Sequence, residues 1–492
     1  MILSIDQGTS STKTIVFDAN GQVVARATVP LKSYYLNDGF VEQDAEDIYQ
    51  NVLSSVKECL SDFESKGFNL NQIKTCGISN QRETFVVWNS KGEPLYNAIV
   101  WQCKRSVNIC EQLKNKGLNE LVKSKTGLII DPYFSGTKLI WLYENNEKVK
   151  NAIDNKEAYF GTIDTWLLFK LTGGNKYFTD YTNASRTLFF NLQTLSWDKE
   201  LLAAFNLSAI NLPELKPSAA HFGETDFNGL LPNRIAISAM IGDSHAAAFG
   251  EGCFTTGTAK ATMGTGSSIL MNIGNEPKTS ANGMLTTICW STENRVDFAL
   301  EGAIVSCGST IEWLKNELNL FSESKQTEAM ANAVEDSNGV YLIPAFSGLG
   351  APHWDMNRKA SISGITFGTT KNHIVWAALA SIPYQIKDVS VAMETDADIV
   401  LQELKVNGGL TSNRFVLQLL ADLLGKPVAN IGMPDVSALG AALLAGLKDG
   451  IFKSIEDLQQ LYADKLFILP AENTEKVLNG YEGWKNAIAN NR

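Results

Sequence analysis

The first residues that could do chemistry lie at the start of the chain, in residues 2–18. Two β-branched, apolar arms predict two short strands, and the Gly-Thr-Ser-Ser turn between them is rich in backbone amides and hydroxyls. Such a turn can cradle a phosphate, and Asp6 would repel that phosphate unless a divalent cation lies between them. We therefore infer Mg²⁺ at Asp6, although a plain hairpin with a polar turn is the alternative. The candidate phosphate ligands are Thr9, Ser10, Ser11 and Lys13.

A similar pattern recurs in mid-chain. Residues 261–272 again place Gly-Thr and a pair of serines between two strand-like arms, with Thr265 in the turn. An Asn-Gly pair at residues 20–21 predicts a tight turn into a third strand, so the chain opens with a three-stranded meander. Two copies that each begin a long α/β segment indicate a duplicated architecture, with one loop from each half facing a shared cleft.

Arg82 and Glu83 are candidates for reading the hydroxyls of a polyol. They lie in a polar stretch, residues 80–84, between two apolar segments that predict strands. Adjacent residues in a regular strand point to opposite faces, so both could reach one ligand only from a bulge or a loop. The alternative is a charge pair that bonds to itself.

Three further residues have both a structural and a functional reading. Trp101 and Tyr133 could be core aromatics, or they could pack against the C–H face of a sugar or polyol. Asp243 follows an apolar strand and precedes a small-residue helix, so it lies at or near the helix N-terminus, where a carboxylate is stabilised. A plain helix cap is the alternative to a catalytic carboxylate.

The elements that would position these residues alternate between strands and helices. Asp44 is a good N-cap for a helix that runs toward Phe63, and Ser135 is a candidate N-cap for a later helix. Further predicted elements are strands at 73–79 and 85–88 and helices at 106–115, 303–314 and 415–424.

Composition limits the class of protein. A length of 492 residues predicts two domains of similar size, and 44% hydrophobic with 19% charged residues is ordinary for a globular protein. The net charge of -11 argues against a nucleic-acid surface. Seven scattered cysteines without metal-ligand spacing favour reduced thiols in a cytosol. The segment around Asp6 lacks a signal-peptide core, and residues 438–447 are too few to span a bilayer.

Several motifs together resemble the FGGY carbohydrate kinase family. They are residues 6–11, 80–84, 98–102, 131–138 and 180–187, in a compatible order and at compatible spacing. The resemblance extends from Ile2 nearly to the C-terminus. It implies an α/β, two-domain actin-like and ribonuclease-H-like ATPase fold with a central cleft, in which ATP and a polyol meet.

The resemblance also implies roles for individual residues. The aspartate that matches Asp243 is the general base that takes the proton from the attacking hydroxyl. The family places adenine and ribose against two glycine-containing segments of the second half. The carried-over nucleotide candidates are Gly308, Glu312, Gly409 and Asn413.

The sequence departs from the family pattern in the substrate pocket. Members that act on glycerol usually have Gly-Asp-Gln at the base motif, whereas Ser244 and His245 follow Asp243 here. They usually have a phenylalanine against the glycerol carbons where this chain has Ser268. Both changes remove bulk, so we hypothesise that the pocket admits a longer polyol or sugar. The matching contacts Arg82, Glu83, Trp101 and Tyr133 argue instead for glycerol.

Other departures concern the phosphate and nucleotide ligands. Lys13 stands where arginine is usual, which keeps the charge but loses the bidentate fork. Glu312 stands where glutamine is common and could alter nucleotide preference, and Asn407 stands where aspartate is common. His245 could be a pocket residue.

We therefore expect an ATP- and Mg²⁺-dependent kinase of a primary hydroxyl on a small polyol, with glycerol first. A C4 or C5 polyol or ketose such as erythritol, xylitol or xylulose is the alternative within this chemistry. A non-catalytic nucleotide-binding sensor is the alternative from another class. We expect domains at 1–245 and 246–492 and a cytoplasmic homo-oligomer, dimer or tetramer, without nucleic acid or membrane partners.

Overall fold

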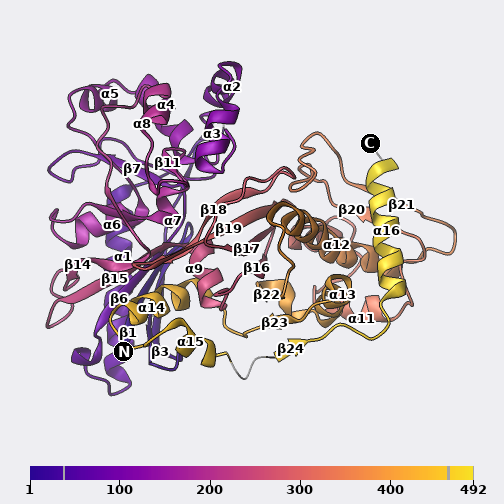
Figure 1. Cartoon of the computed structure of the whole chain (residues 1–492). Helices are drawn as coiled ribbons and strands as arrows, with labels where there is room; N and C mark the ends of the chain where they lie inside the picture. Colours follow the sequence, from indigo (N-terminus) through magenta and orange to yellow (C-terminus); the bar gives the residue numbers. More distant parts are fainter. Residues whose placement is uncertain (37–38, 463–465, 491–492) are drawn as a thin grey trace.

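The computed structural model describes residues 1–36, 39–462 and 466–490. One 13-stranded sheet runs through both halves of the chain, with helices packed against it (Figure 1). Its strands, in order across the sheet, are β24 (Leu466–Ile468), β23 (Val428–Asn430), β22 (Glu403–Asn407), β16 (Thr258–Met263), β17 (Ser267–Gly274), β19 (Arg295–Ile304), β18 (Leu285–Thr292), β14 (Ala219–Thr225), β15 (Ile235–Gly242), β6 (Thr75–Asn80), β1 (Ile2–Gln7), β2 (Ser11–Phe17) and β3 (Val23–Pro30).

The order of strands repeats. In the first half, the antiparallel meander β3-β2-β1 continues into β6 and β15, which run parallel to β1. In the second half, β19-β17-β16 continues into β22 and β23 in the same way. The predicted duplication and the α/β class are therefore confirmed. The two halves join through a single pairing of β14 with β18, between Ala219 and Thr292.

The first meander forms for local reasons. Most residues of β1 and β2 are buried, as in a strand covered on both faces, and the turn between β2 and β3 is closed by Asp18, whose carboxylate accepts from the amides of Asn20 and Gln22. Gly21 has φ of 71°, a left-handed conformation that glycine adopts without strain. This turn sets the register of β2 with β3. The preceding turn, in which the amide of Gly8 donates to the carbonyl of Ser11 at 3.0 Å, places Asp6 opposite Lys13 across β1 and β2.

Sixteen helices lie in the described ranges 1–36, 39–462 and 466–490. They are α1 (Ala45–Ser65), α2 (Val107–Asn115), α3 (Asn119–Thr126), α4 (Ser135–Asn145), α5 (Glu147–Asp154), α6 (Ile163–Leu171), α7 (Tyr181–Ala184), α8 (Lys199–Ala204), α9 (Asp243–Gly250), α10 (Gly308–Asn316), α11 (Gln326–Asn332), α12 (Lys371–Ala397), α13 (Arg414–Leu424), α14 (Val436–Lys448), α15 (Ile455–Gln460) and α16 (Glu475–Asn490). None of the helices in these ranges is long and apolar enough to cross a membrane.

Short strands and turns complete the fold. The five-stranded sheet consists of β4 (Tyr34–Tyr35), β5 (Val41–Gln43), β8 (Ala98–Ile99), β7 (Phe85–Trp88) and β9 (Tyr159–Thr162). The two-stranded pairs are β10 (Phe178–Asp180) with β13 (Glu214–Lys216), β11 (Phe190–Asn191) with β12 (Ser196–Trp197) and β20 (Tyr341–Ile343) with β21 (Ser361–Ser363), and the 3-10 turns are η2 (Leu70–Gln72) and η3 (Gly409–Ser412).

Helix α14 returns from late in the chain to the first half of the sheet, as Figure 1 shows. It packs against α9 so closely that a Cβ on Gly440 would lie 1.8 Å from the carbonyl oxygen of Ala246. On its other side, the hydroxyl of Ser4 on β1 donates to the carbonyl of Ala438 at 2.7 Å. The apolar run at 438–447 is thus a buried core helix, and it holds α9 at the edge of the sheet.

Most predicted elements appear within two residues of their expected bounds. Helix α1 begins after Asp44, whose carboxylate accepts from the amides of Glu46 and Asp47. Two expectations are wrong. Ser135 is not the cap of α4 but its first residue, and its hydroxyl donates to the carbonyl of Glu83 at 2.8 Å. The helix expected at 303–314 begins only at Gly308, because the preceding residues continue β19 as a paired strand.

Candidate active site

A polar cavity of about 390 Å³ lies where the two halves of the sheet face each other. Its walls come from the carboxyl ends of parallel strands, with Asp6 on β1, Arg82 after β6, Asp243 after β15 and Asn407 at the end of β22. Open α/β sheets bind ligands at this edge. The lining residues are Asp6, Thr9, Lys13, Arg82, Glu83, Trp101, Tyr133, Asp243, Ser244, Ala247, Lys260, Thr262, Ser268, Asn407, Pro434, Asp435, Val436 and Ser437.

Ten of the candidate site residues predicted from the sequence line this cavity, and so does Asn407, which departs from the family pattern. The structure therefore brings together residues from widely separated parts of the chain, as the family resemblance implies. These ten are Asp6, Thr9, Lys13, Arg82, Glu83, Trp101, Tyr133, Asp243, Ser244 and Ser268.

Arg82 and Glu83 both face the cavity because the chain leaves β6 in a loop. Glu83 has φ of 59°, which breaks the strand pattern and lets two adjacent side chains reach the same side. Among the described residues, the ion pairs of Arg82 and Glu83 are made to other partners and not to each other. The alternative, an ion pair between Arg82 and Glu83 themselves, is therefore wrong.

These partners form a buried charge cluster behind the cavity. Glu301 on β19 contacts Arg82 at 2.9 Å and Arg186 at 2.7 Å, and Arg186 contacts Glu83 at 2.6 Å. Burial alone would raise the pKa of Glu301, yet the two guanidinium groups hold that pKa well below its ordinary value. Glu301 comes from the second half of the sheet and the other three from the first, so the cluster fixes the two halves around the cavity.

Asp243 is the most accessible carboxylate of this group. It is the first residue of α9, after Gly242 in the capping position, so the plain helix-cap reading does not hold. One carboxylate oxygen accepts from the amide of Ser244 at 2.6 Å and lies 3.3 Å from Nε of Arg82. Its side chain is 40% exposed to the cavity, whereas that of Arg82 is 7% exposed. A ligand can therefore reach the carboxylate while Arg82 holds its orientation.

Asp6, on β1, lines the same cavity as Asp243. Burial and the nearby charge of Asp243 raise its pKa to about 6, against an ordinary value of 3.8. Its one side-chain donor among the described residues is the hydroxyl of Ser79, at 3.0 Å. Two carboxylates that repel each other in this way are stabilised by a cation.

The carboxylates fit Mg²⁺ bound with phosphates. In the part of the chain that the structure describes, no three His, Cys, Asp or Glu side chains converge as a metal site. Mg²⁺ in phosphoryl-transfer sites uses only one or two carboxylates, together with waters and substrate phosphates. Asp6 with Asp243 nearby meets that requirement.

Only part of the first glycine turn reaches the cavity. Thr9 lines the cavity and accepts from Nε1 of Trp101 at 2.9 Å, whereas Ser10 and Ser11 do not line it. Lys13 donates to Asp435 at 2.8 Å, a partner that the sequence did not indicate. The rings of Trp101 and Tyr133 pack edge to face, with centroids 5.6 Å apart.

The nucleotide candidates gather beside the cavity and do not line it. The amide of Gly308 donates to the carbonyl of Gly264 at 2.9 Å, and that of Cys307 donates to the carbonyl of Thr265 at 2.9 Å. Gly408, before Gly409, approaches Met263 so closely that a Cβ would lie 2.4 Å from its carbonyl oxygen. The second glycine turn, the start of α10 and η3 therefore form one surface next to Thr262 and Asn407.

Two of these candidates have structural partners of their own. Asn413 caps α13 by accepting from the amide of Val416 at 3.1 Å, and it donates to Thr327 at 3.2 Å. Glu312 accepts from the hydroxyl of Ser324 at 3.0 Å.

Comparison with known proteins decides the family. The model described as "FGGY family of carbohydrate kinases, N-terminal domain" matches residues 1–250, and its C-terminal counterpart matches residues 259–448. The chain belongs to the FGGY family of carbohydrate kinases. It is therefore an enzyme of the phosphotransferase class that acts on a small sugar or polyol, with the two-domain α/β fold of that family.

Individual relatives cover the whole of this FGGY chain. Glycerol kinase of Carboxydothermus hydrogenoformans is 45% identical over 492 residues, 100% of this chain and 98% of the relative. Glycerol kinase of Thermoanaerobacter pseudethanolicus is 45% identical, over 99% of this chain and 97% of the relative. The solved glycerol kinase of Plasmodium falciparum with ADP has a TM-score of 0.94 at 34% identity, covering 100% of this chain and 98% of that one.

Sequence reasoning missed several residues of this FGGY site. Glu301 and Arg186 complete the charge cluster, Lys260 and Thr262 line the cavity from β16, and Asp435 contacts Lys13. Lys260 had a usable signal, since a lysine within an otherwise apolar and small-residue strand is out of pattern. His245, left open from the sequence, is buried behind the cavity and contacts Thr287 through Nε2 at 3.3 Å.

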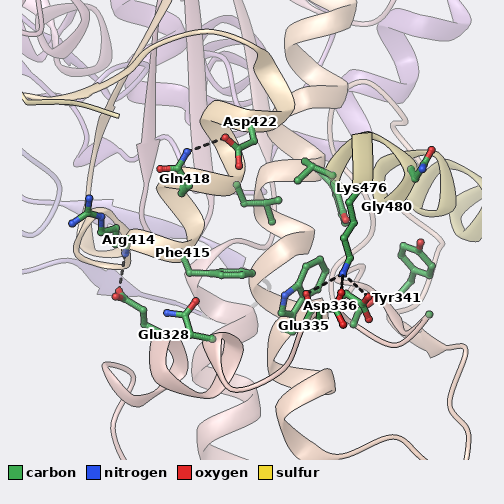
Figure 2. Close-up of a pocket in the computed structure, with 18 residues that line it drawn as sticks. Glu328, Glu335, Asp336, Tyr341, Arg414, Phe415, Gln418, Asp422, Lys476 and Gly480 are labelled. Carbon is green, nitrogen blue, oxygen red and sulfur yellow. Dashed lines mark hydrogen bonds and ion pairs between the residues drawn. The ribbon is translucent and has the colours of Figure 1, made fainter. Parts of the chain in front are cut away.

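The FGGY chain has a second, larger cavity of about 630 Å³ between α11, α13 and α16 (Figure 2). Its floor is aromatic, with the rings of Trp376 and Phe415 5.6 Å apart. On its rim, Lys476 contacts Glu335 at 2.8 Å and Asp336 at 3.0 Å. None of the residues predicted from the sequence lines it.

Proposed function

We propose that this kinase transfers the γ-phosphoryl group of ATP to a primary hydroxyl of glycerol, giving glycerol 3-phosphate. The observation that carries the proposal is the accessible Asp243 carboxylate, held by Arg82 in a polar cavity that also contains Asp6. The naming of full-length relatives at 44–45% identity as glycerol kinases supports glycerol. The similarity to a Plasmodium glycerol kinase that was solved with ADP supports an adenine nucleotide.

The substrate is held by groups of complementary chemistry. Arg82 donates to one hydroxyl of the polyol and Glu83 accepts from another, while Trp101 and Tyr133 contact its C–H face. The buried cluster with Glu301 and Arg186 supports this assignment because it immobilises both charged groups before the substrate arrives. Ser244 and Ser268 complete the wall of the substrate site.

Asp243 acts as the general base. Phosphoryl transfer has a loose transition state, so alignment of the alcohol and neutralisation of charge matter more than basicity. The carboxylate accepts the hydroxyl proton as the O–P bond forms, and ADP leaves on the opposite side. The contact with Arg82 keeps Asp243 turned toward the cavity for that step.

The two glycine turns and Lys13 receive the phosphates of ATP. Thr9, Ser10, Ser11 and Thr265 offer amides and hydroxyls, and Lys13 is shared between Asp435 and the phosphates. Asp6 would hold Mg²⁺, which when bound neutralises phosphate charge. The adenine and ribose lie against Gly308, Glu312, Gly409 and Asn413, whose segments adjoin the cavity.

Three further properties belong to the proposal. We assign the domain boundary to 245/246, next to the cavity and close to residue 250, where the match to the N-terminal family model ends. We place the enzyme in the cytoplasm, because its seven cysteines are all free and buried, which fits a reducing compartment. We infer a homo-oligomer, a dimer or a tetramer, which sedimentation would test directly.

Coupled measurement of ADP release with Mg·ATP and glycerol tests the proposal. We expect saturable turnover and a phosphomonoester on a terminal carbon by ³¹P NMR. ATP hydrolysis without a phosphorylated polyol, or a product phosphorylated at the central carbon, would contradict it.

A further inference from the structure

One wall of the active-site cavity is made of hydroxyls backed by a buried ammonium group. Lys260 on β16 donates to the hydroxyl of Ser244 at 2.7 Å and to that of Thr262 at 3.1 Å. The hydroxyl of Ser244 lies 3.3 Å from that of Ser268 on β17. Thr262 and Ser268 are directly paired across the two strands, so their side chains share one face.

Lys260 is an unusual residue for this position. It is 1% exposed, and within the described ranges no carboxylate lies within 4.0 Å of its ammonium group. Burial lowers the pKa of Lys260, although the charge of Glu251 opposes this effect. An ammonium has three donor positions, and the contacts above occupy two. Burying a charge without a directly contacting counter-ion is unfavourable, so Lys260 lowers the stability of the folded protein. The third donor position of Lys260 is thus available to a group inside the cavity.

Glycerol does not need this wall. Its three hydroxyls are accounted for, since one reacts at Asp243 and the other two are read by Arg82 and Glu83. The hydroxyl-lined wall adjoins the base, because the amide of Ser244 donates to Asp243. If no substrate group contacted this wall, water would have to satisfy its hydrogen-bond donors and acceptors.

We infer that Lys260, Ser244 and Ser268 form a specificity-determining subsite for a fourth substrate hydroxyl, so that the enzyme phosphorylates four-carbon polyols as well as glycerol. This inference rests on the proposed kinase function and names its substrate class. A neutral hydroxyl fits better than an anion, because it can both accept from Lys260 and donate to a serine oxygen. The cavity already holds four carboxylates, on Asp6, Glu83, Asp243 and Asp435, against three cationic side chains.

The test compares glycerol with erythritol, D-threitol and L-threitol. For the unmodified enzyme, we expect kcat/KM for at least one tetritol within about tenfold of that for glycerol. Lys260→Met removes the charge, and Ser268→Phe fills the subsite. Each should lower the tetritol-to-glycerol ratio of kcat/KM by about tenfold or more, the usual effect of losing a hydrogen bond to a charged donor.

The chain offers a matched control for the lysine. Lys405 on β22 pairs directly with Lys260 across the strands and is also buried, at 5% exposure, but its ammonium contacts Glu403 at 2.5 Å and does not line the cavity. Lys405→Met should leave the substrate ratio unchanged, even if the variant is less stable. Ser268→Ala separates loss of the hydroxyl from loss of space.

Calorimetric titration of erythritol into the enzyme with a non-hydrolysable ATP analogue measures binding at the subsite independently of turnover. Binding that is lost in Lys260→Met supports the inference. Normal glycerol turnover with neither turnover nor binding of any tetritol would overturn it. So would a Lys260→Met variant that loses activity equally with all polyols and has a raised KM for ATP, because Lys260 would then serve the phosphates. Failure of glycerol itself would contradict the proposed function instead.

Discussion

Two cavities of this protein contrast in their size and in the pairing of the charges that line them. The larger, about 630 Å³, has aromatic side chains in its lining and a rim on which Lys476 pairs with two acidic residues (Figure 2). The smaller, about 390 Å³, holds a half-exposed Asp243, an Asp6 with a raised pKa and a buried Lys260 without a directly contacting carboxylate in the described ranges. Unsatisfied charge, rather than volume, marks the reaction site.

The reason is physical. A protein stabilises itself by pairing its charges, as Lys476 does with two acidic residues. A catalytic site must instead hold charges ready for a substrate, and the folded state without ligand carries that cost. The buried cluster around Glu301 limits this loss of stability, because Glu301 pairs with Arg82 while Asp243 stays accessible.

The sharpest test of this contrast exchanges one carboxylate for an amide in each cavity. Asp243→Asn keeps the shape but removes the base, so we expect kcat to fall by about 10²- to 10⁴-fold, the usual contribution of general base catalysis. Asp422→Asn makes the same change in the larger cavity, where Asp422 accepts from Gln418 at 2.9 Å. Its kcat should stay unchanged in the same ADP-release assay. Full activity of Asp243→Asn would refute the assignment of the base.

The second test concerns the cluster behind the smaller cavity. Glu301→Gln removes the charge that Arg82 and Arg186 share, and breaking a buried ion pair costs about 3–5 kcal/mol of unfolding free energy. We also expect KM for the polyol to rise, since Arg82 loses its anchor. Urea denaturation and steady-state kinetics measure the two effects.

Its control is another buried carboxylate. Asp388 accepts from Tyr481 and Trp484 on α16, far from the substrate groups in sequence and outside both cavity walls. Asp388→Asn should also lower stability but leave KM for the polyol unchanged. If both variants raise KM alike, the effect of Glu301 is general loss of structure and not positioning of Arg82.

The same contrast explains what the sequence could predict. Local motifs predicted which residues to examine, such as Asp6 before a glycine turn and Asp243 at a helix start, and both line the smaller cavity. Their convergence followed from the duplication, because the carboxyl ends of parallel strands meet at one edge. Helix α1 and its cap at Asp44 followed from local chemistry alone.

What the sequence could not predict depends on contacts between distant segments. Glu301 lies 219 residues from Arg82 along the chain, and Asp435 lies 422 residues from Lys13. No local pattern distinguishes these acids from surface ones. The start of α10 at Gly308 was also missed, because pairing of β19 with β17 overrides the helical pattern of the residues before it.

A third test uses the sign of the pKa shifts. Folded Asp6 holds its proton up to about pH 6, whereas the unfolded residue releases it near 3.8, so stability falls as pH rises through that interval. Without Mg²⁺ or nucleotide, Asp6→Asn should therefore raise the unfolding free energy at pH 7–8 by roughly 1–3 kcal/mol. The gain should vanish below about pH 4, where the unmodified Asp6 is neutral in both states.

Asp336 in the larger cavity should behave in the opposite way. The amide of Asn338 and the ammonium of Lys476 lower its pKa, so its contribution to stability is present at neutral pH and is lost as pH falls below the ordinary range of an aspartate. Asp336→Asn should lower the melting temperature at pH 7 and have no effect in acid. An Asp6→Asn variant that is less stable at pH 7–8 would contradict the comparison.

The smallest effect should come from Lys476→Met, the central cation of the larger cavity. Its side chain is 56% exposed, and exposed ion pairs contribute little because water and salt screen them. We expect kcat and both KM values within about twofold of the unmodified enzyme, the range of a neutral surface change. ADP-release kinetics over a range of glycerol and ATP concentrations would measure this.

A selective rise in KM for ATP would contradict this expectation and would link the larger cavity to the nucleotide segments. The contacts that could carry such a link lie between α13 and α11, where the amide of Arg414 donates to Glu328 at 2.7 Å beside the contact of Asn413 with Thr327. The two cavities would then act together in catalysis, and the volume of the larger cavity would also indicate function.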